Sequence, residues 1–247
     1  MTKSLISVVL AIVASCGLHA DVTETFTQTY PISATGVVNL ENVNGPVEII
    51  GWSKNEVQVE AIKTAPDAED LARIQLLIEA TPDRVSIETK HKKKLLLFGT
   101  WRGEVRYTLH VPAGIRLETI SVINDLIRVR GVTGPVQLKT VNGPIDATGL
   151  TGAGRFETVN GGITVAYESL DGIETLAFRT INGRCDLTLP ADEPFSVNSK
   201  SVNGGVRTDM PIKIEKSGLA QFRGSVGEGG PKITFNSVNG ELVIHAQ

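Results

Sequence analysis

Few side chains in this sequence could do chemistry, and they lie far apart. The histidines beyond residue 20 are isolated, with no His-x-x-x-His or Cys-x-x-Cys spacing for a metal; they are His91, His110 and His245. No Gly-x-Ser-x-Gly elbow is present for a nucleophile. Polysaccharide-acting parallel β-helix enzymes place carboxylates on one face, so Asp146, Asp186 and Asp209 are the candidates for such chemistry. We expect no enzyme, no catalytic residue, no metal and no cofactor, and keep a polysaccharide-acting β-helix enzyme as an alternative.

The start of the chain predicts export. Residues 1–20 have a basic beginning, a short apolar stretch and small residues near its end, which is the layout of a secretory signal. Val13-Ala14-Ser15-Cys16 resembles the lipobox of bacterial lipoproteins, which makes Cys16 a lipidation candidate. Ordinary cleavage after Ala20 is the alternative. We therefore expect an exported protein, located in the periplasm, at the outer membrane as a lipoprotein, or at the cell surface.

The charge balance argues against strongly anionic partners. The chain carries a net charge of −3, and removing residues 1–20 makes it about −4. Such a surface offers no electrostatic case for nucleic acid or for a generally anionic partner. One basic run beside apolar and aromatic residues could contact lipid or lipopolysaccharide phosphates, with a solvated hairpin tip as the alternative. Its members are Lys92, Lys93, Lys94, Phe98 and Trp101.

A repeated phrase must position any functional side chains. It reads Thr/Ser, Val/Ile, Asn, Gly, any residue, aliphatic, as in Thr140-Val141-Asn142-Gly143-Pro144-Ile145. Repetition at intervals of roughly 20 residues is typical of stacked repeats. We expect a structural corner ladder in which each asparagine amide hydrogen-bonds to its own copy in the next repeat. The ladder comprises Asn44, Asn124, Asn142, Asn160, Asn182, Asn203 and Asn239 with Gly45, Gly143, Gly161, Gly183, Gly204 and Gly240. In one copy Asp125 replaces glycine, where we expect a strained or differently shaped corner.

The spacing within the repeat predicts the fold. A second corner, such as Gly149-Leu150-Thr151-Gly152, falls midway between Asn-Gly pairs, and a strand of about six residues fills each interval. Asn-Gly also marks hairpins, but equivalent turns of a meander would lie roughly 10 Å apart and gain nothing from being alike. The sequence therefore predicts an all-β, single-stranded parallel β-solenoid (β-helix-like), with an N-terminal antiparallel β cap containing one short helix.

Several local expectations follow from that fold. The Val/Ile before each asparagine and the aliphatic residue three places after it should point inward. The corner glycines should supply positive φ, so that Gly143→Val or Gly161→Val would be damaging. Stacking should also place opposite charges side by side on neighbouring strands. The expected pairs are Arg128 with Asp146, and Asp186 with Arg207.

The segment from Gly51 to about Arg116 lacks the phrase and is interpreted as the cap, with a separate small domain as the alternative. A short helix is expected from Asp67 to about Ile74, because acidic residues occupy its first turn. Alternating strands are expected over residues 56–62, 84–88 and 105–111. The resulting division is 1–20 signal peptide, 21–116 N-terminal strands and capping β segment, and 117–247 repeats.

The repeat phrases, the early Asn42-Val43-Asn44-Gly45 and the ending through Val238-Asn239-Gly240 resemble one known family. It is the bacterial exported β-strand-repeat family of unknown function, labelled adhesin-like or related to auto-transporter adhesin head domains. The resemblance covers almost all of the mature chain. It implies a β-solenoid in the cell envelope, with no catalytic residues to carry over.

Together these features predict a non-enzymatic cell-envelope protein with an adhesin-like binding or structural surface. Its partner would be an envelope component, a glycan or a protein surface, with no nucleic acid and with membrane contact only through a lipid anchor. An end-to-end assembling solenoid is a further alternative, because the chain stops just after Leu242-Val243-Ile244 and could leave an open C-terminal edge for self-association.

Overall fold

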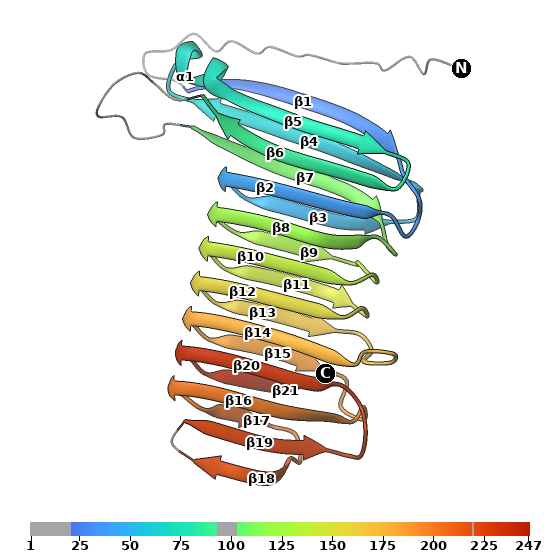
Figure 1. Ribbon diagram of the computed structural model, residues 1–247, viewed down its shortest axis with the longest axis vertical. Helices are drawn as coiled ribbons and strands as arrows, with labels where there is room; N and C mark the ends of the chain where they lie inside the picture. Colours follow the sequence, from blue (N-terminus) through green and yellow to red (C-terminus); the bar gives the residue numbers. More distant parts are fainter. Residues whose placement is uncertain (1–20, 93–102, 219) are drawn as a thin grey trace.

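The chain folds into two β-sheets that lie face to face (Figure 1). The computed structural model describes residues 21–92, 103–218 and 220–247. Within them the 10-stranded sheet contains, in spatial order, β1 (Val22–Pro31), β4 (Glu56–Ala65), β7 (Glu104–Pro112), β3 (Val47–Trp52), β9 (Ile127–Arg130), β11 (Ile145–Leu150), β13 (Ile163–Tyr167), β15 (Cys185–Leu189), β21 (Leu242–Ala246) and β17 (Val206–Thr208). The 11-stranded sheet contains β18 (Lys213–Gly218), β19 (Gln221–Val226), β16 (Phe195–Asn203), β20 (Lys232–Asn239), β14 (Thr175–Asn182), β12 (Gly154–Asn160), β10 (Val136–Asn142), β8 (Arg116–Asn124), β2 (Val37–Asn44), β6 (Arg84–His91) and β5 (Ile74–Thr81).

Each repeat supplies one strand to each sheet. The chain reverses at the Asn-Gly corner, crosses to the other sheet, and reverses again at the second corner, so that β10, β11 and β12 alternate between the sheets. Equivalent strands of successive repeats are parallel and in register, as where Asn142 lies opposite Asn160 and Ile145 lies opposite Ile163. The Asn-Gly corners of successive repeats therefore stack on their own copies.

The expectation of a single-stranded parallel solenoid is wrong, because the strands form two large mixed sheets. Antiparallel pairs occur at the N-terminal end, where β4 lies between β1 and β7 and where β5 pairs with β6. They recur at the C-terminal end, where β19 pairs with β16 and β18. In each of these pairs at least one strand comes from a segment that lacks the repeat phrase, and strands joined by a short turn, as β5 and β6 are, pair antiparallel.

The N-terminal segment extends both sheets. The expected helix is present as α1 (Ala68–Arg73), where the side chain of Asp67 accepts a hydrogen bond from the backbone N–H of Asp70 at 2.7 Å. The three expected strands are also present as β4, β6 and β7. Of these, β4 and β7 lie in the 10-stranded sheet and β6 lies in the other. The division of the chain at residue 116 stays a prediction.

The last repeat is inserted between earlier ones. β20 lies between β14 and β16, and β21 lies between β15 and β17 (Figure 1). The C-terminal strand is thus hydrogen-bonded on both sides, and the open C-terminal edge expected for end-to-end assembly is absent from the described residues. The sheets end instead at β17 and β18.

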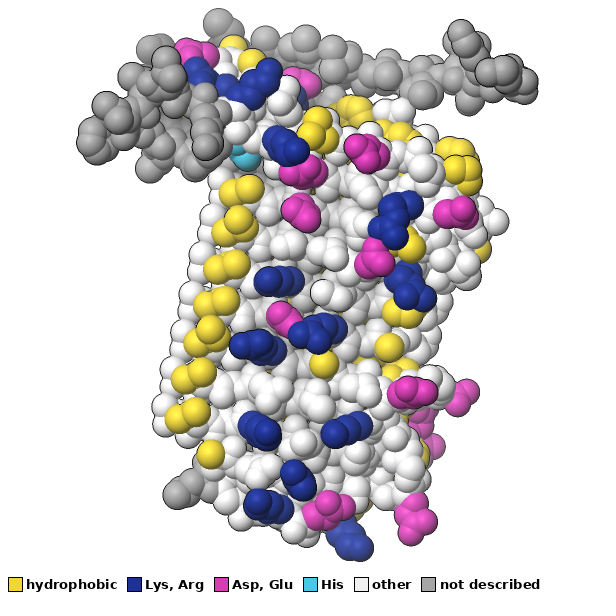
Figure 2. Space-filling view, in the orientation of Figure 1, with side chains coloured by type: hydrophobic (Ala, Val, Ile, Leu, Met, Phe, Trp, Pro, Cys, Tyr) yellow, Lys and Arg dark blue, Asp and Glu magenta, His cyan; other side chains and the backbone are white. Residues whose placement is uncertain are grey.

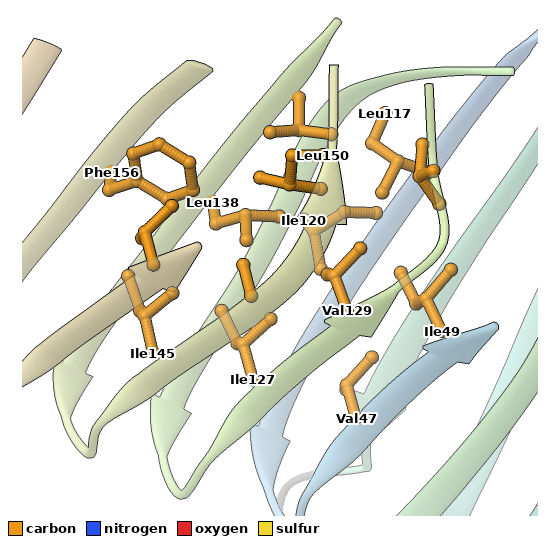
Figure 3. Packing of buried hydrophobic residues seen from close by; sticks show 14 of the residues in the cluster. Val47, Ile49, Leu117, Ile120, Ile127, Val129, Leu138, Ile145, Leu150 and Phe156 are labelled. Carbon is orange, nitrogen blue, oxygen red and sulfur yellow. The ribbon is translucent and has the colours of Figure 1, made fainter. Parts of the chain in front are cut away.

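The core is a thin apolar layer between the sheets. Figure 3 shows Ile49, Ile127 and Ile145 from the 10-stranded sheet in the same layer as Leu117, Ile120 and Leu138 from the other. Equivalent core residues also stack along each sheet. The rings of Phe156 and Phe178 are nearly parallel, with centroids 5.1 Å apart. Within residues 21–92, 103–218 and 220–247, no helix has the length and apolar character needed to cross a membrane.

Candidate binding face

The asparagines of the repeat phrase form one column at the corner of the molecule. Six of the seven amide nitrogens donate to the side-chain oxygen of the neighbouring asparagine, at 2.8–3.0 Å, and that of Asn44 at the end of the column donates to the carbonyl oxygen of Gly103 at 3.3 Å. The spatial order is Asn44, Asn124, Asn142, Asn160, Asn182, Asn239 and Asn203. Because each amide inside the column both donates and accepts, the ladder satisfies these side chains without covering them from solvent.

The corner glycines are required for close approach of the backbone. A Cβ on Gly161 would lie 2.0 Å from the carbonyl oxygen of Gly143, and a Cβ on Gly183 would lie 1.9 Å from that of Gly161. Of the six corner glycines only Gly45 has a positive φ, at 104°. The expectation that they all supply positive φ is therefore wrong, although a side chain at Gly161 is still excluded. Asp125, which replaces glycine in one copy, has a positive φ of 153°. Its carboxylate accepts a hydrogen bond from the backbone N–H of Leu126 at 2.7 Å.

The orientation of the residues before each asparagine also differs from expectation. The hydroxyl residue points inward, with Thr140 at 1% and Thr158 at 4% relative exposure. The Thr158 hydroxyl donates to the carbonyl oxygen of Gly143 at 3.1 Å, and that of Ser201 donates to Gly240 at 2.9 Å. The hydroxyl thus pairs with the carbonyl at the neighbouring corner, and strand alternation then turns the Val/Ile outward. The first copy substitutes Asn42, whose buried amide donates to the carbonyl oxygen of Val105 at 2.8 Å.

The outward Val/Ile residues form a column that we name the aliphatic stripe. Its members, in spatial order, are Val43, Ile123, Val141, Val159, Ile181, Val238 and Val202. Val202 is 64% exposed and Val238 is 43% exposed. Figure 2 shows a column of yellow side chains along the left margin of the outer face of the 11-stranded sheet. The sequence phrase contained this signal, since Thr and Val are adjacent and only one of them can face the core.

The carboxylates considered for catalysis lie on the outer face of the other sheet. Asp146 forms an ion pair with Arg128 at 3.1 Å, which confirms that expected pair. The second expected pair is wrong, because β21 separates Asp186 from Arg207; the guanidinium of Arg207 instead contacts Glu241 at 2.7 Å.

One histidine lies between two of these carboxylates. His245 Nε2 is 3.4 Å from Asp186 Oδ1, and His245 Nδ1 is 3.7 Å from Asp209 Oδ2. Asp186 also accepts from Arg184 at 2.8 Å. The described part of the chain contains no group of three or more His, Cys, Asp or Glu residues arranged to hold a metal. These contacts make a surface network of ion pairs.

The other sequence candidates divide between described and undescribed parts of the chain. Lys92 is exposed at the end of β6, whereas Lys93, Lys94, Phe98 and Trp101 lie outside the described residues. Cys16 also lies outside them. Cys185 is fully buried in β15, and burial raises the pKa of its thiol, so the thiol stays protonated and unreactive.

A shallow hollow lies at the N-terminal end of the same face as the stripe, between β2, β5, β6 and β8. Acidic side chains line much of it, including Glu41, Glu79, Glu88 and Glu118. A hydrogen bond from Arg84 holds the pKa of the Glu118 carboxyl below its usual range. Glu88 forms an ion pair with Lys90 at 3.1 Å. Charges of both signs therefore meet in this hollow.

Comparison with known proteins gives distant structural neighbours. No protein-family model and no curated protein matches the sequence. A provisionally named cell adhesion protein from Clostridium sporogenes ATCC 15579 is similar in structure, with a TM-score of 0.49 at 10% identity over 91% of this chain and 100% of that chain. A provisionally named adhesin from Bacteroides fragilis NCTC 9343 has a TM-score of 0.38 at 14% identity over 90% and 97%. A provisionally named lipid-binding protein from Parabacteroides distasonis ATCC 8503 has a TM-score of 0.25 at 12% identity over 90% and 97%. Those names refer to binding and adhesion and not to catalysis.

Proposed function

We propose that this chain is a non-enzymatic, adhesin-like binding protein of the cell envelope, and that it holds its partner on the outer face of the 11-stranded sheet. The observation that carries the proposal is the exposed aliphatic stripe. All six large hydrophobic side chains exposed in the described residues belong to this sheet, and four of them, Ile123, Ile181, Val202 and Val238, are members of the stripe. A contiguous exposed apolar patch on a soluble surface is typical of an interaction site.

The geometry also favours binding to a large, extended partner. Seven stacked strands at about 4.8 Å each give the stripe a length of roughly 29 Å. The hydrogen-bonded corner ladder fixes one side of this surface, so its shape is rigid before a partner arrives. Preorganisation of this kind reduces the entropy lost on binding. We further propose that the protein is exported, and that Cys16 carries a lipid anchor. Mass spectrometry of the mature N-terminus tests the anchor.

Binding to isolated cell envelopes tests the function. The full-length protein is incubated with envelopes of the organism that encodes it, and the sedimented fraction is compared with that of a variant carrying Ile181→Thr, Val202→Thr and Val238→Thr. Threonine keeps the β-branched shape and the strand preference while making the surface polar. We expect the variant to bind at least fivefold more weakly.

The matched control is Ile50→Thr, a half-buried isoleucine on the outer face of the 10-stranded sheet. It should bind as the unmodified protein does. Equal binding by the stripe variant, or release of sugars from envelope glycans by the unmodified protein, would overturn the proposal.

A further inference from the structure

A group of basic side chains lies beside the aliphatic stripe. We name it the basic patch; its members are Lys139, Arg179, Lys200, Lys213, Lys216, Arg223 and Lys232. They face outward from the C-terminal part of the 11-stranded sheet, from β10 to β18. Figure 2 shows dark blue side chains gathered over the middle and lower part of this face, next to the yellow column.

None of the seven basic-patch residues has an ion pair among the described residues. The neighbouring Arg155 differs, because it is paired with Glu157 at 2.5 Å. One carboxylate lies among these cations, since Glu157 in β12 is in register with Lys139 on one side and Arg179 on the other. Because Glu157 is paired with Arg155, the seven charges of the patch remain in excess on this face. The net charge of −3 for the whole chain hides this local excess.

The outer face of the other sheet is built differently. From β9 to β17 its guanidinium groups are matched by carboxylates of the same surface, as in Arg128 with Asp146 at 3.1 Å and Arg207 with Glu241 at 2.7 Å. Arg130 lies 3.7 Å from Glu48. Each repeat supplies one strand to each sheet, so unpaired positive charge is a property of one face and not of the repeat.

The stripe and the patch run in parallel. Val202 and Lys200 lie on β16, Ile181 and Arg179 on β14, and Val141 and Lys139 on β10, in each case two residues apart. Residues two apart on a strand face the same side and are about 6.6 Å apart. The row beside the apolar groups is therefore Lys139, Glu157, Arg179, Asn236 and Lys200 in spatial order, with three cations and one carboxylate.

We propose that this surface docks onto an anionic lipid bilayer, with the basic patch at the headgroup phosphates and the aliphatic stripe in the boundary between headgroups and acyl chains. This inference rests on the proposed function and names its partner class. Adjacent basic and apolar rows are the chemistry of interfacial membrane binding. A soluble polyanion would use the cations but leave the stripe in water.

A second copy of the chain fits this surface less well. The N-terminal half of the same face carries charges of both signs that are already paired, such as Glu118 with Arg84 at 2.5 Å and Glu88 with Lys90 at 3.1 Å. Of the four glutamates that line the hollow there, only Glu41 and Glu79 have no ion pair among the described residues, so that half offers too few free carboxylates to match seven cations. Two basic patches brought together would repel each other.

Vesicle co-sedimentation tests the proposal. The full-length chain carries Cys16→Ser in every arm, so that no lipid anchor can form. Vesicles of phosphatidylcholine with phosphatidylglycerol are compared with vesicles of phosphatidylcholine alone. We expect at least tenfold tighter binding to the anionic vesicles, and a marked loss when the salt is raised from about 0.1 M to 0.5 M, because screening shortens the range of the attraction.

Two variants probe the two rows. Arg179→Glu with Lys200→Glu should weaken binding to anionic vesicles at least tenfold, and Val202→Thr with Val238→Thr should weaken it several-fold. The charge control is Arg106→Glu with Arg130→Glu, which changes the net charge equally at two exposed arginines on the outer face of the 10-stranded sheet. It should bind within twofold of the unmodified chain.

Three outcomes would overturn the proposal. The first is equal binding to the two kinds of vesicle. The second is equal loss in the patch variant and its charge control. The third is that soluble polyphosphate binds as tightly as anionic vesicles do, and that Val202→Thr with Val238→Thr leaves vesicle binding unchanged. The partner would then be an anionic polymer. Retained, stripe-dependent binding to envelopes in any of these cases would leave the proposed function standing.

Discussion

At the scale of single residues, Gly161 and Gly162 are neighbours in sequence with very different surroundings. A Cβ on Gly161 would lie 2.0 Å from the Gly143 carbonyl oxygen, whereas one on Gly162 would lie 3.6 Å from that of Arg184. We therefore expect Gly161→Ala to lower the free energy of unfolding by about 2–3 kcal/mol, because the corner must shift. Gly162→Ala should change it by less than about 1 kcal/mol. Chemical denaturation measures both, and similar values would contradict the role of close approach.

The asparagine ladder gives a second comparison between residues of one type. Asn160 donates to Asn142 at 3.0 Å and accepts from Asn182 at 2.9 Å. Asn236 is exposed on the same sheet, and its side chain has no hydrogen bond to the described residues. We expect Asn160→Ala to lower the free energy of unfolding by about 1–2 kcal/mol, because two amide hydrogen bonds are lost. Asn236→Ala should have an effect within about 0.5 kcal/mol. Equal losses would mean that the ladder contributes nothing specific.

The buried phenol of Tyr107 predicts alkaline sensitivity. Burial raises the pKa of Tyr107 to about 12, although its hydroxyl also contacts that of Thr89 at 2.8 Å. Between about pH 10 and 12 the unfolded chain has released this proton while the folded chain keeps it, so stability falls as the pH rises. The slope for one such group is about 1.4 kcal/mol per pH unit. Tyr107→Phe should reduce the slope of unfolding free energy against pH by that amount. An unchanged slope would show that Tyr107 titrates normally in the folded state.

The sequence predicted correctly that the asparagines of the repeat phrase stack, because hydrogen bonding between identical amides explains why the phrase is repeated. Copies of Asn142 in successive repeats do meet in one column. The prediction failed for the adjacent pair Thr158 and Val159, because hydrophobicity alone assigns the valine to the core. The carbonyl of Gly143 reverses that choice by accepting from the threonine hydroxyl at 3.1 Å. A contact between repeats decides the orientation, and such a contact is not visible in one copy of the phrase.

At the scale of elements, the insertion of β20 and β21 is the feature that sequence could not reveal. Every copy of the phrase can pair with every other copy, so the repeat gives no spatial order. The order follows from the excursion through β18 and β19, which pair antiparallel beyond β16 and return the chain to the far side of that strand. The strands themselves were predictable, since β4, β6 and β7 alternate apolar and polar residues.

The insertion makes the C-terminal strand structurally essential. Leu242 in β21 is fully buried between neighbours on both sides, whereas Ile214 in β18 is 58% exposed at the end of its sheet. We expect Leu242→Ala to lower the free energy of unfolding by about 2–5 kcal/mol, through lost burial and the cavity left behind. Ile214→Ala should change it by about 0.5 kcal/mol or less. Thermal and denaturant unfolding measure both variants, and a small effect at Leu242 would argue that β21 lies at an edge.

At the scale of the whole molecule, the sequence predicted the class of fold but not its architecture. Two corners in each repeat are compatible with one stack or with two facing sheets, and the non-repeating segments decide between them by pairing antiparallel at both ends. Net charge was similarly uninformative. From β9 to β17 the 10-stranded sheet pairs its arginines with carboxylates of the same surface, while the 11-stranded sheet leaves the basic patch unpaired, and a sum over the chain cannot distinguish these arrangements.

The core predicts how the whole molecule unfolds. One continuous cluster of buried side chains extends from Ile32 near the N-terminal end to Ile244 in the inserted strand. Stacked repeats that contact only their neighbours can lose cooperativity, but here the core is continuous and the inserted β20 and β21 join residues 232–246 to the repeats at residues 175–208. We therefore expect one calorimetric transition, with equal calorimetric and van't Hoff enthalpies. Val85→Ala in β6 and Leu242→Ala in β21, which truncate fully buried side chains at opposite ends, should both lower the temperature of that same transition. Two resolved transitions, each sensitive to only one of the variants, would mean that the ends of the molecule unfold independently.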